Sequence, residues 1–179
     1  MSTLSVTTLR GLSTSPTPTK IEVASGHSLH APGHVIQVLS TTKVDDHFQS
    51  ASTSFVDVTG VTLTITPKFV TSKILVTVSG AYGMNTASRM ALFNIVRAST
   101  NIGQPTSAKS NSSTRTLYDS SADELHQLHI EFLDSPATTS ATIYKLQMRS
   151  NTTNTLFIGD RVSEDARQGT TMTLMEIAQ

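Results

Sequence analysis

The 179-residue sequence contains no cysteine and no tryptophan, and only 15% of its residues are charged. The absence of cysteine excludes disulfide bonds, thiolate zinc sites and cysteine nucleophiles. Basic and acidic residues number 13 each, so the formal net charge is zero, and the basic residues form no cluster. Nucleic-acid binding needs a basic surface to neutralise phosphates. We therefore expect no nucleic-acid partner.

Long apolar segments are also missing. No apolar run approaches the roughly 20 residues that cross a bilayer, and the first 20 residues lack the basic start and apolar middle of a signal peptide. Anionic membranes recruit polybasic segments, which this sequence does not have. We expect synthesis in the cytoplasm without a signal peptide, and no membrane insertion.

Serine and threonine are abundant and make up about three residues in ten, well above ordinary usage. Threonine suits extended backbone because it branches at Cβ. Aromatic residues are only 5% of the chain. This composition is typical of a β protein with an uncharged polar surface.

From Val35 onward, apolar residues alternate with polar ones in short segments separated by turn residues. Residues 34–40 form a continuous apolar run that predicts a strand buried on both faces, and Asp57–Gly60 is interpreted as a turn. Residues 89–97 are compatible with a helix but fit a doubly buried strand equally well. Residues 98–124 are predicted to be a polar loop with at most a short strand, and Ser121 with Glu124 could cap one helical turn. The segments expected to form strands are 34–40, 54–58, 59–67, 72–83, 89–97, 128–134, 141–150, 155–159 and 170–178.

About eight to ten short strands without a long helix predict an all-β fold, an antiparallel jelly-roll-like β-sandwich. Several of the segments carry apolar residues on both faces. In a lone two-layer sandwich, one face of each sheet meets water, so the extra apolar surface needs a partner. We therefore expect the chain to self-associate around a rotational axis.

The sequence divides into three parts. Residues 1–20 show no strand or helix pattern and form an extended N-terminal arm, which is either a disordered tail or a segment that orders against a partner. Residues 21–34 are a junction, and residues 35–179 form the body. The apolar residues expected to dock the arm are Leu4, Val6, Leu9 and Leu12. The residues expected to form the junction are Ile21, Val23, Pro32 and Gly33.

Three groups of residues were considered as metal sites. His27, His30 and His34 have a ligand-like spacing, but Gly26, Pro32 and Gly33 interrupt it, so loop histidines are the better interpretation. His126 and His129 are three residues apart and point to opposite faces of a strand. Asp160, Glu164 and Asp165 alternate with arginines and are interpreted as a solvated, self-neutralising loop. We predict no metal and no cofactor.

Known catalytic patterns are missing as well. The sequence contains no nucleophile elbow, phosphate-binding loop, zinc-protease helix or dinucleotide fingerprint. We therefore predict that the protein is not an enzyme.

Several strings in the body resemble virion structural proteins of tailed phages, especially marine and cyanobacterial ones. They are APGHVIQV (31–38), STSFVDVTGVTLTITP (52–67), SKILVTVSG (72–80), IEFLDSPATTSATIYKLQ (130–147) and TTMTLMEIA (170–178). The order of these strings along residues 21–178 is more specific than any one of them. The resemblance implies a β-rich, trimeric protein attached to the virion and made in the host cytoplasm, of the tail-fibre or appendage type. Unlike long fibres, this chain has no repetitive shaft.

These expectations combine into one functional hypothesis. The protein is a short fibre or tail-associated appendage, docked on other virion proteins by its arm, and its loop 98–124, with Asn101 and Tyr118, is a surface for a host receptor. A capsid decoration or cement protein is the alternative within the structural class. A carbohydrate-binding adsorption module, contacting a host surface glycan, is the alternative from another class.

Overall fold

A computed structural model of the chain describes residues 31–179 except 46–47, 107–112, 120–121, 123 and 162–165. The described residues belong to the second of two compact units, Ala31–Gln179. The division into arm, junction and body stays a prediction. The predicted features that lie outside the described residues are Leu4, Val6, Leu9, Leu12, Ile21, Val23, His27, His30, Glu164, Asp165 and the Ser121 end of the proposed helical turn.

The described part of the chain is built from strands alone. It contains no helix, and therefore none long and apolar enough to cross a membrane. The strands are β1 Val35–Lys43, β2 Phe48–Ser50, β3 Val56–Ile65, β4 Lys73–Met84, β5 Arg89–Arg97, β6 Thr100–Ile102, β7 Arg115–Asp119, β8 His126–Asp134, β9 Thr142–Ser150, β10 Leu156–Ile158 and β11 Thr170–Ile177.

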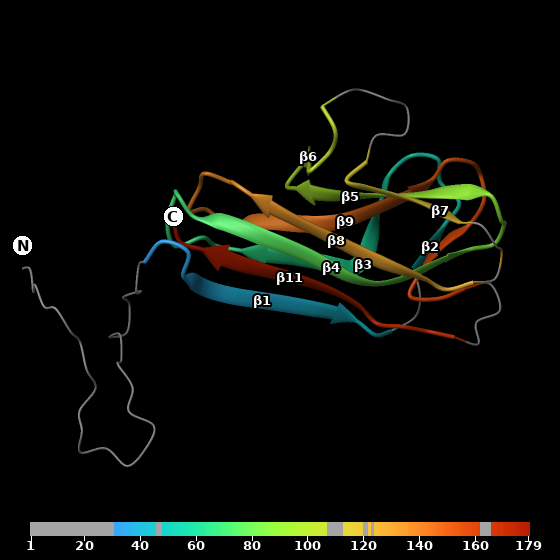
Figure 1. The fold of residues 1–179 in the computed structure, drawn as a ribbon, viewed down its shortest axis with the longest axis horizontal. Coiled ribbons are helices and arrows are strands. Elements are labelled where there is room, and N and C mark those ends of the chain that lie inside the picture. Colours follow the sequence, from blue (N-terminus) through green and yellow to red (C-terminus); the bar gives the residue numbers. More distant parts are fainter. Residues whose placement is uncertain (1–30, 46–47, 107–112, 120–121, 123, 162–165) are drawn as a thin grey trace, which may run out of the picture. The chain divides into compact units, whose positions relative to one another are not determined.

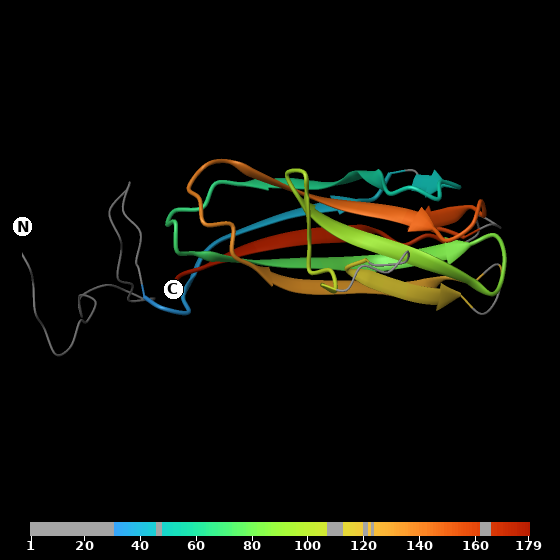
Figure 2. The same cartoon turned by 90° about the horizontal axis from the view of Figure 1, so that it is seen from above.

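The strands form two antiparallel sheets (Figure 1 and Figure 2). In sheet A, β1, β11, β4 and β8 lie side by side. The short strands β10 and β2 continue this sheet beyond the ends of β11 and β1. In sheet B the order is β3, β9, β5, and both β7 and β6 pair with the far edge of β5.

The pairing between strands is nested. β1 pairs with β11, β3 with β9, β4 with β8, and β5 with β7, so the first half of the body pairs with the second half in reverse order. One long hairpin rolled into two packed sheets in this way is a jelly roll. The predicted fold class, an all-β antiparallel jelly-roll-like sandwich, is confirmed.

The core forms because alternate residues of the two sheets face each other and exclude water. Along β9, residues 142, 144, 146, 148 and 150 are buried and the residues between them are half-exposed. The same alternation in β11 buries Met172 and Leu174. Tyr82 of sheet A meets Phe93 of sheet B edge to face, with ring centroids 5.6 Å apart, a favourable aromatic geometry.

The strand β5 is buried on both faces, as one of its two sequence interpretations predicted. All six residues from Ala91 to Val96 are buried. One side faces the core, and Gln104 and Thr114 contact the other side at Asn94. Asn94, fully buried, accepts hydrogen bonds from Gln104 Nε2 at 2.7 Å and from the backbone N–H of Thr114 at 3.2 Å.

Three local predictions were wrong. The first strand is not buried on both faces, because it lies at the edge of sheet A and leaves Val38 52% exposed. Residues 98–124 contain two strands, β6 and β7, because both extend sheet B along the free edge of β5.

The third correction concerns Asp57–Gly60, which is a bulge and not a turn. β3 continues through it: Asp57 pairs with Gln147 and Thr62 with Lys145, so residues 58–61 lie opposite the single residue 146. Gly60 takes φ +88°, a conformation that favours glycine. The bulge allows Val58 and Val61 both to reach the core, where each is 0% exposed.

The first and last described segments lie at one end of the body. Gly33 donates its backbone N–H to Ala178 O at 2.8 Å, and Ala178 donates to His34 O at 2.9 Å. The loops 66–72 and 135–141 lie at this same end, because β3 and β8 end there. The loops 85–88 and 151–155 lie at the opposite end.

Candidate functional site

The outer face of sheet A carries an apolar row that crosses all four of its main strands. Val38, Met175, Leu75 and Leu133 are successive Cα partners from β1 through β11 and β4 to β8. Val38 is 52% exposed and Leu133 is 44% exposed. Val35, which pairs with Ile177, lies next to this row and is 42% exposed. We call these residues the apolar patch: Val35, Val38, Leu75, Leu133, Met175 and Ile177.

Beyond the row, the face becomes polar but largely uncharged. The next two rows across β1, β11 and β4 hold only serine and threonine. Ser40 Oγ lies 3.1 Å from Thr173 Oγ1, and Thr42 Oγ1 lies 2.9 Å from Thr171 Oγ1, so neighbouring hydroxyls hydrogen-bond to each other. On β8, the first of these rows continues with Glu131, which pairs with Thr77. Lys73 lies on the opposite side of the apolar row, where it pairs with Ile177.

The outer face of sheet B is different. Asp57 accepts hydrogen bonds from Lys145 Nζ and Gln147 Nε2, both at 2.7 Å. The bond from Lys145 is the main cause that lowers the pKa of Asp57, and the bond from Gln147 adds to it. The guanidinium of Arg149 lies 5.1 Å from the centroid of the Phe55 ring, in cation–π range. This face is a polar surface whose charges are paired within the chain.

Two carboxylates lie buried at the end of the body where the first and last described segments meet. Asp134 accepts from Arg97 and Tyr144, and Glu176 accepts from Gln37 Nε2 at 2.5 Å and from the backbone N–H of Lys68 at 2.7 Å. Burial tends to raise the pKa of Glu176, but the bond from Gln37 and the backbone donors outweigh it and lower that pKa. Asp134 joins three strands, and Glu176 holds the loop 66–72 to β11, so both carboxylates have a structural role.

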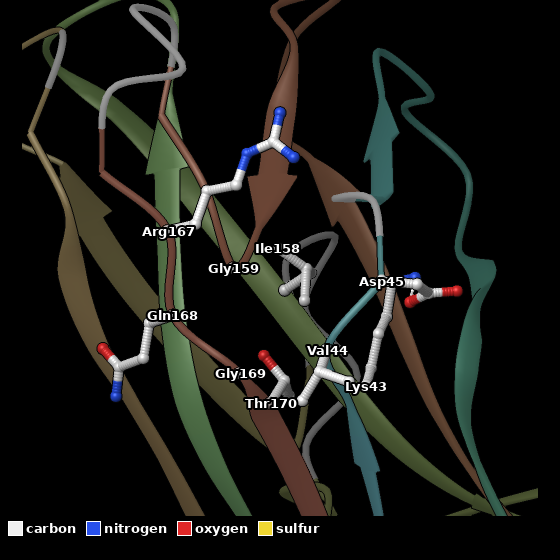
Figure 3. A pocket seen from close by; sticks show the side chains of 9 residues that line it. All are labelled: Lys43, Val44, Asp45, Ile158, Gly159, Arg167, Gln168, Gly169 and Thr170. Atoms are coloured by element: carbon white, nitrogen blue, oxygen red, sulfur yellow. Dashed lines mark hydrogen bonds and ion pairs between the residues drawn. The ribbon is translucent and has the colours of Figure 1, made fainter.

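A small cleft lies between the end of β1 and the segment that joins β10 to β11 (Figure 3). Its volume is about 180 Å³, below the roughly 300–1,000 Å³ of small-molecule sites. Lys43 Nζ lies 2.5 Å from Asp45 Oδ1, and Arg167 Nε lies 3.3 Å from Asp160 Oδ2. Figure 3 shows Arg167 and Asp45 on opposite sides of Ile158. The charges around the cleft therefore pair with each other, and we assign no ligand to it.

The residues predicted from the sequence as functional do not gather in one place. Pro32 and Gly33 occupy the centre of a turn closed by a 2.9 Å hydrogen bond from His34 N to Ala31 O. Asn101 pairs with Val96, whereas Tyr118, 62% exposed, pairs with Met90. Six residues of strand separate these partners, or roughly 20 Å. Asn101 and Tyr118 therefore belong to different parts of sheet B and do not form a single patch.

The candidate metal residues are also dispersed. Among the described residues, no three histidine, aspartate or glutamate side chains lie close enough to hold an ion. His126 stacks on Tyr82 with ring centroids 5.4 Å apart, and His129 is exposed on the other face of β8. Asp160 is fully buried beside Arg167.

The apolar patch was not identified as a site from the sequence. The sequence signal was present, since β1, β4, β8 and β11 each carry apolar residues at both odd and even positions. What was missing was the register, which places one such residue from each strand in a single row.

No protein-family model and no curated protein sequence matches this chain. Among solved structures, it is similar to a chain in the structure of the Gt strain of infectious bursal disease virus, with 13% identity and a TM-score of 0.44 over 92% of this chain and 43% of that one. A chain in the structure of the Gx strain gives 13% identity and a TM-score of 0.43, covering 92% of this chain and 42% of that one. This chain thus spans less than half the length of either viral chain. The jelly-roll assignment rests on the strand pairing described above.

Proposed function

We propose that this chain is a non-enzymatic structural protein of a virus particle. The observation that carries the proposal is the apolar patch on the outer face of sheet A, with Val38 52% and Leu133 44% exposed. Apolar surface that a single copy leaves in water is typical of a surface that another protein covers. Jelly rolls occur in viral capsid proteins, lectins and cupins, so the fold alone does not decide between these classes.

Within this class, the proposed protein is a short fibre or tail-associated appendage of a tailed phage, and it assembles as a homotrimer. This part follows from the resemblance of the strings at 31–38, 52–67, 72–80, 130–147 and 170–178. The N-terminal arm, with Leu4, Val6, Leu9 and Leu12, docks on other virion proteins. The turn at Ala31–His34 lies at the end of the body that also carries Val35 and Ile177. The loops 85–88 and 151–155, at the other end, are then free to face the host.

Two alternatives use the same body. A capsid decoration or cement protein would cover its apolar patch with shell subunits. A carbohydrate-binding adsorption module would use exposed residues such as Tyr118, 62% exposed, because aromatic rings stack on sugars. Binding to a glycan array that is lost in Tyr118→Ala would favour this module over a purely structural role.

The experiment that tests the proposal follows the protein into particles. Purified virions from cells that express the tagged full-length chain are probed with an antibody to the tag. We expect label on the particle, at the tail for an appendage and over the shell for a decoration protein. A variant lacking residues 1–20 should keep a folded body and lose the label. Absence of the full-length chain from purified virions would refute the virion role.

The number of copies is tested separately by light scattering. A homotrimer has three times the chain mass of 19.2 kDa. A monomer at every concentration would refute the trimer without bearing on whether the protein is a virion component.

A further inference from the structure

We propose that the outer face of sheet A packs face to face against the same face of a second copy of this chain. The inference rests on the apolar patch that carries the proposed function, not on the trimer, and it names the partner and the symmetry of one contact. Identical surfaces that contact each other are related by a two-fold axis.

The first observation is the contrast between the two outer faces of the sandwich. On sheet B, Asp57, Lys145 and Gln147 bond to one another within the chain. On sheet A, the apolar row from Val38 to Leu133 is continuous across four strands. The rows beside it hold hydroxyl groups that already pair with each other. Such hydroxyls can be covered by a partner without a large loss of hydrogen bonds to water.

The second observation is the placement of the two charges. Lys73 lies two residues from Leu75 on one side of the apolar row, and Glu131 lies two residues from Leu133 on the other side, because β4 and β8 are antiparallel. Neither makes an ion pair with another described residue. A two-fold axis that runs along the apolar row packs this row against the same row of the second copy. The surface on one side of the row then faces the surface that lies on the other side of the row in the partner. Lys73 of each copy then faces the part of the partner that carries Glu131, so the contact is self-complementary in charge.

The size of the face sets the strength of the contact. Four strands are about 19 Å wide and seven residues are about 23 Å long, which gives about 440 Å² on each copy. Two copies together bury about 900 Å² of flat area, below the roughly 1,200–2,000 Å² of specific, stable interfaces and in the range of weak, transient contacts. We therefore expect a weak contact, visible as a doubling of mass at high concentration. Sheets that pack face to face cross at about 30°.

This two-fold contact differs from the contact that closes a trimer. A three-fold axis needs two different surfaces on each chain, whereas the face of sheet A meets its own copy. A chain that makes both contacts joins two trimers. A chain that makes the two-fold contact alone forms a dimer. The measured quantity is therefore the mass of the species present at low concentration, whether monomer or trimer, and the inference expects this mass to double at high concentration.

The first test is a charge exchange at the proposed contact, measured by sedimentation equilibrium of the full chain across a wide concentration range. Lys73→Glu places two acidic groups opposite each other, and Glu131→Lys places two basic groups opposite each other. Each single variant should weaken the doubling by about tenfold or more. The double variant Lys73→Glu/Glu131→Lys should restore it. Unchanged doubling in both single variants, or no recovery in the double variant, would overturn the pairing.

The second test removes the apolar contact and includes a matched control. Leu133→Asp introduces a charge into the apolar row and should abolish the doubling. Thr64→Asp introduces the same charge on the exposed outer face of sheet B and should leave the doubling unchanged. Thermal unfolding of both variants verifies that the body is folded.

If the wild-type chain never doubles its mass, the inference is wrong even if the low-concentration species is a trimer. If the low-concentration species is a monomer that doubles, the trimer is wrong and the inference stands.

Discussion

Tyr144, near the start of β9, donates its hydroxyl hydrogen to Oδ2 of Asp134, the last residue of β8, at 2.7 Å. Asp134 is only 5% exposed and Tyr144 is fully buried. Arg97 Nη1 lies 2.8 Å from both carboxylate oxygens. Burial and the neighbouring carboxylate together raise the pKa of Tyr144, so its hydroxyl stays protonated and continues to donate. The three side chains join β5, β8 and β9, which belong to both sheets.

Tyr144→Phe tests this junction. The variant keeps the ring in the core and removes one donor from a buried carboxylate, so we expect a loss of about 1–3 kcal/mol in the free energy of unfolding. Urea unfolding followed by circular dichroism measures it. Tyr118→Phe, at an exposed position, is the control and should change stability by less than about 0.5 kcal/mol. Equal stability of the two variants would contradict the role of the hydroxyl.

Glu176 should make stability depend on pH. Its folded pKa is lowered from the ordinary value of 4.5, so its contribution is present above pH 4.5 and is lost as the pH falls through the folded pKa. Glu176→Gln should therefore be less stable than wild type at pH 7 and should lose less stability on acidification. Glu131→Gln, which removes an exposed carboxylate that makes no ion pair with another described residue, is the control. Parallel pH profiles of wild type and Glu176→Gln would rule out this linkage.

Gly60 should be difficult to replace. Its φ of +88° is unfavourable for any residue with a side chain, and a Cβ there would lie 3.3 Å from Cδ of Lys43. We expect Gly60→Ala to cost about 1–2 kcal/mol. The neighbouring Thr59→Ala, at an exposed position, should cost less. Chemical denaturation of the pair measures the difference, and a stable Gly60→Ala would mean that the bulge can rearrange.

Asn94 should control how firmly Gln104 and Thr114 hold to β5. Its side-chain oxygen accepts from both Gln104 and Thr114. Asn94→Ala removes both bonds and leaves a gap in a fully buried position. Limited proteolysis should then cut faster within residues 98–106 than it does in the wild-type chain. Gln104→Ala, which removes only one of the bonds, should give an intermediate rate.

The sequence was sufficient to predict the class of fold, because the period-2 alternation in β4, β8, β9 and β11 survives directly as buried and exposed faces. It was not sufficient where burial depends on distant partners. Residues 35–40 are as apolar as a central strand, yet β1 is an edge strand because only β11 pairs with it. At Asp57–Gly60 the sequence has residues that are typical of turns, but the structure forms a bulge there. The bulge allows Val58 and Val61 to be buried on the same side of β3.

The candidate site could likewise be predicted only in part from the sequence. Apolar residues at both odd and even positions indicated that some outer surface needs a partner. The row from Val38 to Leu133 depends on the register of three strand pairs, which bring together residues up to 137 positions apart. Asn101 and Tyr118 were grouped because they are close in the sequence. Their pairing with opposite ends of β5 separates them.

The nested pairing also sets the order in which a newly made chain can fold. The innermost pair, β5 with β7, closes over a short stretch of sequence, whereas β1 must wait for β11, because Val35 pairs with Ile177, which lies 142 residues later. Contacts between such distant residues form slowly. Until β11 is in place, β1 and the edge of β4 that pairs with β11 lack their sheet partner, and the growing chain is most exposed to aggregation during this interval.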